Sequence, residues 1–454
     1  MRQNYFKGYS KPYEVRLQSL NGLIKFFEEN EVSSWPGCIQ EMYCTTAFHR
    51  VLLLKHCAKI WDVPTLKQFY MMFSSRWQIS RYAWPLYFLH AHDKGISTSQ
   101  RLRDNLKELM TPKQQPQDLL SFPATSKLCP EPLGVALVID TWNYPIMLGV
   151  LPLAGALAAG NTAILKPSVV SRHTAELLGT VLPKYLDSRL ARVVGHTAER
   201  DRHMLSALLE CKTDKIFFTG SPKVGRIVYK AAASHLTPVT LELGGKNPVL
   251  VHHSADIDLA AKRTIWGRMM NGGQQCIAPD YVLIDKRVAK QFYTSCSKWI
   301  GVFYEGKPEE PGRVGRIVDS ARMAAQVDIL SSHQGEVLCG GTFDEPSRYV
   351  SPTVLRLQGG DPVLSGETFG PILMCVEVDD MTEACKYVCA KEKPLSMYVF
   401  SRDSAVTDFV LQNTSAGGVT VNGTLMHVSH PNLPFGGVGA SGKCINHCCL
   451  FRSN

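Results

Sequence analysis

From about residue 133, short apolar runs alternate along the chain with longer stretches that have helical spacing. Leu133–Asp140 carries five large apolar side chains and predicts a buried strand, and Pro145–Ala159 after it predicts a helix. The same alternation continues to Gly418–Val421. Strands that alternate with helices predict parallel, doubly wound sheets, so the fold class is α/β. The other predicted strands are 161–165, 191–194, 215–218, 239–243, 248–251, 281–284, 353–357, 372–378, 396–400 and 418–421, and the other predicted helices are 174–185, 201–211, 224–234 and 255–270.

The first 130 residues follow a different pattern. Residues 12–31 have rough helical spacing and predict an amphipathic helix. Residues 33–98 are rich in Trp, Tyr, Phe, Met and Cys without a clean period, and we interpret them as poorly ordered; a membrane-facing or partner-binding insert is the alternative. Residues 101–130 predict a helix followed by a connector rich in Pro and Gln.

Composition narrows the class of protein. The chain has 454 residues, 45% of them apolar, and a formal charge of +9 that is spread along the chain, so we expect no nucleic-acid partner. The 14 cysteines include no matched Cys-x-x-Cys pairs, and the spacing of Cys385 and Cys389 favours packing, so no metal site is expected. The Met1 end has no apolar signal core. Thr141–Leu165 is uncharged, but its prolines, glycines and asparagines favour a turn, a buried helix and a strand over a membrane span.

Two residues, each beside glycines, carry the candidate chemistry. Cys276 follows an Asn-Gly-Gly turn, and Glu242 lies in a strand of otherwise apolar residues that ends in two glycines. A thiol nucleophile and a carboxylate base are the minimum parts for chemistry through a thioester. Buried packing is the alternative for the cysteine, and a solvated turn residue is the alternative for the glutamate.

Four further features suit an anionic cofactor or an oxyanion. Gly220–Gly225 joins a strand to a helix, where free backbone N–H groups can face phosphate, although many such turns have no ligand. Asn143 follows a strand and could donate to an oxyanion, or cap a turn. Lys166 ends another strand and could bind ribose or phosphate, or remain solvated. Glu367 and Phe369 form an acidic and aromatic turn that could hold a ribose, or pack.

Together these motifs resemble the aldehyde dehydrogenase superfamily, most closely its class 3 group and, within it, the B-type branch. The resemblance extends over residues 131–442 and has the motifs in the family's order. They are Thr141–Pro145, Leu165–Ser168, Phe217–Ser221, Leu241–Pro248, Gly273–Cys276, Glu367–Pro371 and Pro434–Gly439, with His235–Thr240 and Ala278–Tyr281 indicating class 3.

The resemblance implies an aldehyde-dehydrogenase-like fold with two doubly wound α/β domains and a small bridging element for oligomerisation. It implies oxidation of medium- and long-chain aliphatic and aromatic aldehydes to acids, with NAD or NADP, through a thiohemiacetal and a thioester. The implied catalytic residues are Cys276 as nucleophile, Glu242 as the water-activating base and Asn143 as an oxyanion donor. The implied cofactor-binding residues are Trp142, Lys166, Gly220, Ser221, Gly225, Glu367 and Phe369.

We therefore expect four segments: an atypical N-terminal region at 1–130, a dinucleotide-binding domain at 131–241, a catalytic domain at 242–418 and a return to the bridging element at 419–454. The expected partners are a small aldehyde and a second copy of the chain. The expected location is the cytoplasm, with membrane association as an alternative that the tail does not support. A catalytically impaired isoform of the same family is the alternative function.

Two departures from the family pattern matter for function. Val169 stands where the family usually has a glutamate that contacts the adenosine ribose. Losing that charge removes an acceptor for the 2′-hydroxyl and a repulsion against a 2′-phosphate, so we expect a shift toward NADP. After Gly442 the family's aromatic-rich tail is shortened to a piece around His447–Leu450, so dimer stability is in question. The cysteines at 448 and 449 are candidates for acylation, but we expect them to be unmodified.

Overall fold

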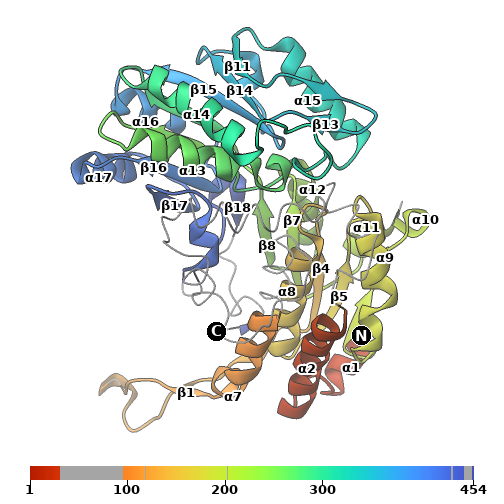
Figure 1. The fold of residues 1–454 in the computed structure, drawn as a ribbon. Coiled ribbons are helices and arrows are strands. Elements are labelled where there is room, and N and C mark those ends of the chain that lie inside the picture. Colours follow the sequence, from red (N-terminus) through yellow and green to blue (C-terminus); the bar gives the residue numbers. More distant parts are fainter. Residues whose placement is uncertain (31–95, 118, 202, 431–432, 444–451, 454) are drawn as a thin grey trace, which may run out of the picture. The chain divides into compact units, whose positions relative to one another are not determined.

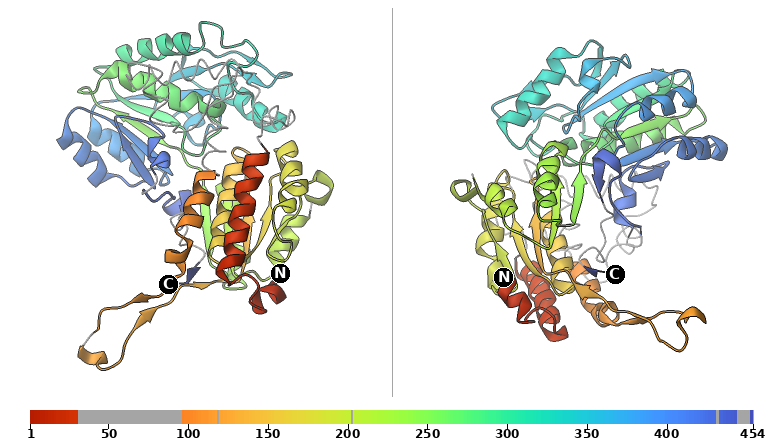
Figure 2. Two further views of the ribbon diagram at one scale, coloured as in Figure 1. Left: turned by 60° about the horizontal axis from the view of Figure 1, so that its bottom comes forward. Right: turned by 180° about the vertical axis from the view of Figure 1, so that it is seen from behind.

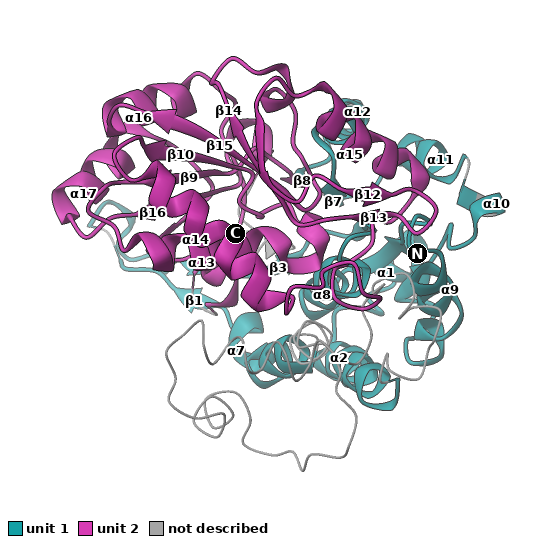
Figure 3. Ribbon diagram, turned by 45° about the horizontal axis from the view of Figure 1, so that its top comes forward, with its two compact units in different colours: residues 1–41, 88–241, 445–454 teal, residues 42–87, 242–444 magenta. Residues whose placement is uncertain are grey.

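A computed structural model describes residues 1–30, 96–117, 119–201, 203–430, 433–443 and 452–453. The chain divides into two compact units, which Figure 3 draws in different colours. The first unit takes residues 1–41, 88–241 and 445–454, and the second takes 42–87 and 242–444. The predictions for 33–98, except its last three residues, and for 447–450 lie outside the described residues.

The first unit is built around parallel strands. These strands belong to a six-stranded sheet of order β18-β8-β7-β4-β5-β6, whose edge strand β18 falls in the residue range of the second unit; β4 pairs in parallel with both β5 and β7. Because the chain runs from β4 to β5 and β6 on one side and then returns to β7 on the other, the winding direction reverses beside β4. The bounds are β4 (Val135–Ile139), β5 (Thr162–Lys166), β6 (Ala191–Val193), β7 (Lys215–Gly220), β8 (Val239–Leu243) and β18 (Gly442–Lys443).

The helices of this unit follow the predicted order, as Figure 1 shows. They are α1 (Arg2–Phe6), α2 (Tyr13–Glu29), α8 (Pro145–Ala158), α9 (Arg172–Thr180), η3 (Leu182–Lys184), α10 (Ala198–Asp201), α11 (Met204–Glu210) and α12 (Pro222–Ala233). The amphipathic stretch at 12–31 forms α2, whose apolar face packs against α8. The uncharged stretch 141–165 forms a turn, α8 and β5, as predicted. None of the helices in the described parts of the chain combines the length and hydrophobicity that a bilayer crossing requires.

The segment before β4 differs from the prediction in one respect. After α7 (Leu106–Met110), the region expected to be an irregular connector contains an antiparallel pair, β1 (Lys113–Gln114) and β2 (Lys127–Leu128), joined through η2 (Leu119–Ser121). Both views in Figure 2 show this hairpin extending from its unit. Each strand has two exposed residues, so no apolar alternation marked them in the sequence. A second short pair joins β3 (Glu131–Pro132) to β19 (Arg452–Ser453).

The second unit contains a seven-stranded sheet in the order β11-β14-β15-β10-β9-β16-β17. All neighbouring strands are parallel except the edge pair of β11 and β14. Its strands are β9 (Pro248–Val251), β10 (Tyr281–Asp285), β11 (Glu336–Cys339), β14 (Thr353–Leu357), β15 (Ile372–Val378), β16 (Ser396–Phe400) and β17 (Gly418–Val421), beside the hairpin of β12 (Phe343–Asp344) and β13 (Tyr349–Val350).

Side chains on each strand of this sheet alternate between two cores, as the pleat requires. Val249 and Val282 face a core that includes residues of α13 and α14, and Leu250 and Leu283 face a core that includes residues of α15, α16 and α17. The helical elements are α13 (Ile257–Met269), η4 (Met270–Gly273), α14 (Ala289–Phe303), α15 (Ser320–Ser332), η5 (Pro362–Leu364), α16 (Met381–Cys389), α17 (Ser404–Asn413), η6 (Met426–Ser429) and η7 (Gly439–Ser441). This double covering explains why the strands read as nearly continuous apolar runs.

Candidate active site

Cys276 lies in the loop that joins α13 and η4 to β10. The Asn-Gly-Gly turn before it has φ values of 54°, 61° and 76°, the left-handed region that favours glycine. A Cβ atom at Gly273 would overlap the carbonyl oxygen of Gly370. Only glycine therefore allows this loop to pack closely against the turn that contains Glu367 and Phe369.

Both predicted carboxyl groups lie in the second unit, near enough to the Cys276 thiol for their charges to raise its pKa. Glu242 lies on β8, is 5% exposed, and neither of its carboxylate oxygens has a hydrogen-bond partner. Burial raises the pKa of Glu242 well above its usual range. Glu367 accepts a hydrogen bond from the backbone N–H of Gly245 at 3.2 Å, and burial together with the charge of Asp280 raises the pKa of Glu367 to about 8. A Cβ atom at Gly244 would overlap the Glu367 carboxylate, so that glycine makes the close approach.

The surroundings of the Cys276 thiol oppose its ionisation in this state. Burial, with the nearby carboxyl groups of Glu367 and Glu242, raises the pKa of Cys276 to about 12. The backbone N–H groups of Cys276 and Ile277 act in the opposite direction by hydrogen bonding to the sulfur. Formation of the Cys276 thiolate is therefore favoured only by backbone N–H donors to the sulfur and by any positive charge on a bound ligand.

A buried ionic network supports the turn beside the thiol. Asp280 forms an ion pair with Lys246 at 2.6 Å and lies 3.8 Å from Arg268, and all three side chains are at most 8% exposed. Asp280 also accepts hydrogen bonds from the backbone N–H and the hydroxyl of Thr368, at 2.9 and 2.8 Å. Although burial opposes ionisation, the two cations hold the pKa of Asp280 below its usual value. The network thus ties the start of β10 to the turn that presents Glu367.

The remaining predicted residues lie in the first unit, most of them at the carboxyl ends of its strands. Trp142 and Asn143 follow β4, Lys166 ends β5, and Gly220 and Ser221 lie where β7 passes into α12. Ligands of doubly wound sheets bind at these strand ends, where the winding direction reverses. Ser221 is also the N-cap of α12 and accepts from the N–H of Val224 at 3.4 Å, and Gly225 is buried in the first turns. The helix N-terminus and these strand ends have the chemistry and topology that fit a dinucleotide.

Lys166 is not simply solvated. Its ammonium group forms an ion pair with Asp201 and donates to the carbonyl of Pro167 at 3.2 Å. Nearby, Asp140 is buried, and its Oδ2 atom has no hydrogen-bond partner. Burial raises the pKa of Asp140 well above its usual range, with the Lys166 charge acting against the shift.

Sequence reasoning missed the supporting side chains of the site. Lys246 and Asn247 lie within the Leu241–Pro248 motif and Asp280 within Ala278–Tyr281, so their proximity to Glu242 and Cys276 in sequence was a usable signal. Arg268 had no such signal, because a single arginine within a helix is normally solvent-facing. In the structure it is 1% exposed and donates to the carbonyls of Pro279 and Gly370.

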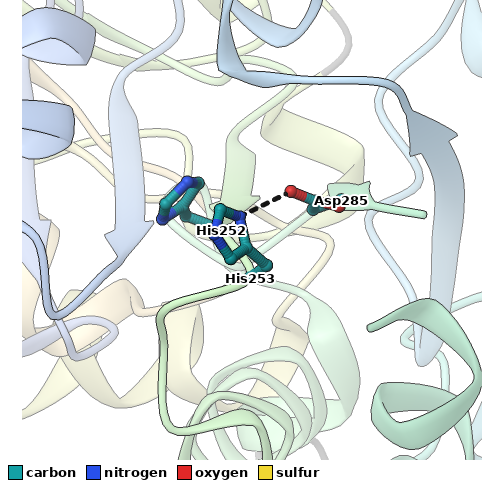
Figure 4. Close-up of side chains that lie close together, drawn as sticks. All are labelled: His252, His253 and Asp285. Carbon is teal, nitrogen blue, oxygen red and sulfur yellow. Dashed lines mark hydrogen bonds and ion pairs between the residues drawn. The ribbon is translucent and has the colours of Figure 1, made fainter. Parts of the chain in front are cut away.

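A separate polar cluster lies at the carboxyl ends of β9 and β10. Figure 4 shows His252, His253 and Asp285, with the Nδ1 atom of His253 3.0 Å from the Asp285 carboxylate. Three such groups could hold a cation. However, the guanidinium of Arg287 donates a hydrogen bond to the Asp285 carboxylate at 2.5 Å and lies 2.6 Å from the Nδ1 atom of His253. The arginine already supplies the positive charge that a metal ion would bring to this carboxylate.

Comparison with known proteins places these features in one family. The model of the aldehyde dehydrogenase family matches residues 97–446. The mouse protein named dimeric NADP-preferring aldehyde dehydrogenase is 44% identical over 319 residues, which cover 70% of this chain and 69% of the relative. Human aldehyde dehydrogenase family 3 member B1 is 37% identical over 467 residues, and the match covers 100% of this chain and 90% of the human protein. The substrate-bound AldH of Staphylococcus aureus has a TM-score of 0.83 at 31% identity, covering 99% and 92% of the two chains.

Proposed function

The chain belongs to the aldehyde dehydrogenase family, and from this premise we propose that it oxidises medium- and long-chain aliphatic and aromatic aldehydes through a thioester on Cys276. The observation that supports the proposal is that the Cys276 thiol, which lies on a glycine-rich loop, and the buried, unpartnered carboxyl group of Glu242 belong to one unit and are close enough for their charges to interact. Catalysis is assigned to residues 242–418 and dinucleotide binding to residues 131–241. NAD or NADP is the electron acceptor of such an enzyme.

The first half of the reaction forms and oxidises a carbon–sulfur bond. The sulfur of Cys276 attacks the carbonyl carbon, and the carbonyl oxygen becomes the oxyanion of a thiohemiacetal. The proposed backbone donor to this oxyanion is the N–H of Cys276. The proposed side-chain donor is the amide of Asn143, and such a donor contributes about 3–4 kcal/mol. A bound NAD or NADP would supply the acceptor for the hydride on the same carbon, so that the two-electron oxidation of the thiohemiacetal would give a thioester.

The second half hydrolyses the thioester. Glu242 takes a proton from water, the resulting hydroxide attacks the acyl carbon, and the carbon–sulfur bond breaks to release the acid. Glu242 suits this role because its two oxygens have no competing donors. Since the pKa of Glu242 is raised by burial, the ionised base gains population as pH rises, so the hydrolysis rate should increase toward alkaline pH.

Two sets of residues have proposed cofactor-binding roles, and each set is described within its own unit. Lys166, Gly220, Ser221 and Gly225 would hold the adenosine and pyrophosphate, with Trp142 beside them. Glu367 and Phe369 would hold the nicotinamide ribose. Phe369 has φ of 48°, a conformation uncommon for a non-glycine side chain and a sign of a constrained, functional turn. Because Val169 offers no carboxylate, the adenosine end should accept a 2′-phosphate, and the mouse relative is named NADP-preferring.

A homodimer is the proposed assembly. The mouse relative's name describes it as dimeric. On this chain, η2 in the β1–β2 hairpin exposes Leu119 and Leu120 at 94% and 95%, with Phe122 beside them at 73%. An exposed apolar patch of this kind suits a protein partner. Sedimentation equilibrium of the purified chain would test the assembly, and a single species of monomer mass would refute it.

The experiment that tests the reaction compares two site variants with a thiol control. Cys276→Ser should abolish NAD(P)H formation from hexanal or benzaldehyde. Glu242→Gln should retain a single-turnover burst of NAD(P)H but lose steady-state turnover, because only hydrolysis is blocked. Cys389→Ser, which removes an exposed thiol, should behave as wild type. Undiminished oxidation by Cys276→Ser would refute the proposal.

A further inference from the structure

Three successive carbonyl groups of the Cys276 loop are held by buried side chains. The side-chain amide of Asn247 donates to the carbonyl oxygens of Cys276 and Ala278, at 2.8 and 3.0 Å. The hydroxyl of Tyr398 donates to the carbonyl oxygen of Ile277 at 2.5 Å. Asn247 is 1% exposed and Tyr398 is 0% exposed, so water does not compete for these bonds. We call Asn247 and Tyr398 the carbonyl brace.

The position of Asn247 is itself fixed by its neighbours. Its Oδ1 atom accepts from the backbone N–H of Ser396 at 2.8 Å. Its backbone carbonyl accepts from the N–H of Asp280 at 2.9 Å. An asparagine side chain has one acceptor oxygen and two donor hydrogens, and here both kinds of group are used, so its orientation is defined. Asn247 thus links the start of β9, the start of β16 and the Cys276 loop, all within the second unit.

Holding a carbonyl also directs the N–H of the same peptide group. In a planar trans peptide the C=O and N–H bonds point in opposite directions. With the Cys276 carbonyl held by Asn247, the N–H of Ile277 is therefore directed to the other side of the peptide. That N–H is one of the two backbone donors that hydrogen bond to the Cys276 sulfur. If this peptide could rotate, the sulfur would lose a donor that favours its thiolate.

We propose that Asn247, assisted by Tyr398, is a positioning residue that aims the Ile277 N–H at the Cys276 sulfur and so sustains its nucleophilicity. This inference rests on the proposed function in taking Cys276 as the nucleophile. It goes beyond that function in assigning thiol reactivity to two side chains that touch neither substrate nor cofactor. The titratable groups that face the thiol are Glu367, Glu242 and Tyr398.

The test measures alkylation of Cys276 by iodoacetamide across pH, followed by mass spectrometry of the Cys276 peptide in the full-length protein. Asn247→Leu keeps the branched shape, removes the donors and adds no charge. We expect its alkylation rate to fall roughly tenfold between about pH 7 and 9, which is equivalent to a rise of about one pH unit in an alkylation midpoint that lies above this range. The kcat for aldehyde oxidation should fall by a similar factor, while KM for the cofactor stays unchanged.

Asn161→Leu is the matched control. Asn161 is also 1% exposed, donates to the carbonyl of Ala156 at 3.0 Å and accepts from the N–H of Gly134 at 2.8 Å, but it lies in the first unit. Its loss should lower stability without moving the alkylation midpoint of Cys276. A general loss of packing would affect both variants, whereas loss of the brace affects only Asn247→Leu.

Tyr398→Phe keeps the inference testable if Asn247→Leu does not fold. This variant removes one hydroxyl from the brace and should shift the midpoint in the same direction by a smaller amount. A wild-type alkylation profile in folded Asn247→Leu, or in Tyr398→Phe where only that variant folds, would overturn the inference. Because alkylation needs no turnover, the outcome is independent of the proposed function, which fails separately if Cys276→Ser remains active.

Discussion

Replacing Asp280 with asparagine tests whether buried charge stabilises the second unit. Asp280 is 2% exposed at its side chain and lies between Lys246 and Arg268, which are 8% and 1% exposed. Asparagine keeps the shape and an acceptor for Thr368, but leaves two buried cations without their counter-ion. Lys286 and Asp379 offer a matched comparison, because this pair has the same 2.6 Å separation but side chains that are 59% and 74% exposed.

The size of the expected loss in unfolding free energy depends on the desolvation of the charges rather than on the distance between them. Removing one partner of a buried ion pair costs about 3–5 kcal/mol, because the remaining charge stays buried and uncompensated. A folded domain is stable by only about 5–15 kcal/mol, so Asp280→Asn should consume a large part of that margin. Its transition should therefore fall by roughly 6–20 °C at about 2–4 °C per kcal/mol. Asp379→Asn should leave the transition within error, because solvent screens that pair.

Thermal and urea unfolding, followed by intrinsic fluorescence and circular dichroism, would measure both variants against wild type. The pKa of Asp280 is lowered in the folded state, so its stabilisation is complete above the unfolded pKa and is lost as pH falls through the folded pKa. The difference between Asp280→Asn and wild type should therefore shrink below about pH 4. Equal losses in the two variants, or a loss for Asp280→Asn that persists unchanged in acid, would refute the reasoning.

Three other substitutions have defined outcomes. Burial raises the pKa of Glu367 from 4.5 to about 8, so ionisation of Glu367 destabilises the fold as pH rises through that range. Glu367→Gln should therefore be more stable than wild type at pH 9, by a few kcal/mol in order of magnitude, and equally stable at pH 4. Urea titrations at both pH values would check this. Gly244→Ala places a Cβ atom against the Glu367 carboxylate and should raise KM for the cofactor about tenfold; an unchanged KM would show that Glu367 does not bind it. Val169→Glu should shift the ratio of kcat/KM for NADP and NAD toward NAD by about tenfold, and a ratio equal to that of wild type would exclude this position as the determinant.

The strand and helix order of residues 133–421 could be predicted because each element has its own local signal. Val249, Leu250 and Val251 are all buried on a sheet covered on both faces, so β9 reads as a continuous apolar run. Cys276, Glu242 and the Gly220–Gly225 turn could also be singled out as candidates from the sequence, because each lies in a glycine-containing motif. The β1–β2 hairpin was missed because its strands are short and exposed.

Local sequence patterns were therefore enough to give the set of elements and the residue types available for chemistry. Which of those residues contact one another depends on how the chain packs. The pairing of Asp280 with Arg268, the bond from Thr368 to Asp280 and the bond from Tyr398 to Ile277 join residues that are 12 to 121 positions apart. Such contacts leave no local pattern, because their stability comes from removing charge and backbone polar groups from water together, which happens only once the chain has folded.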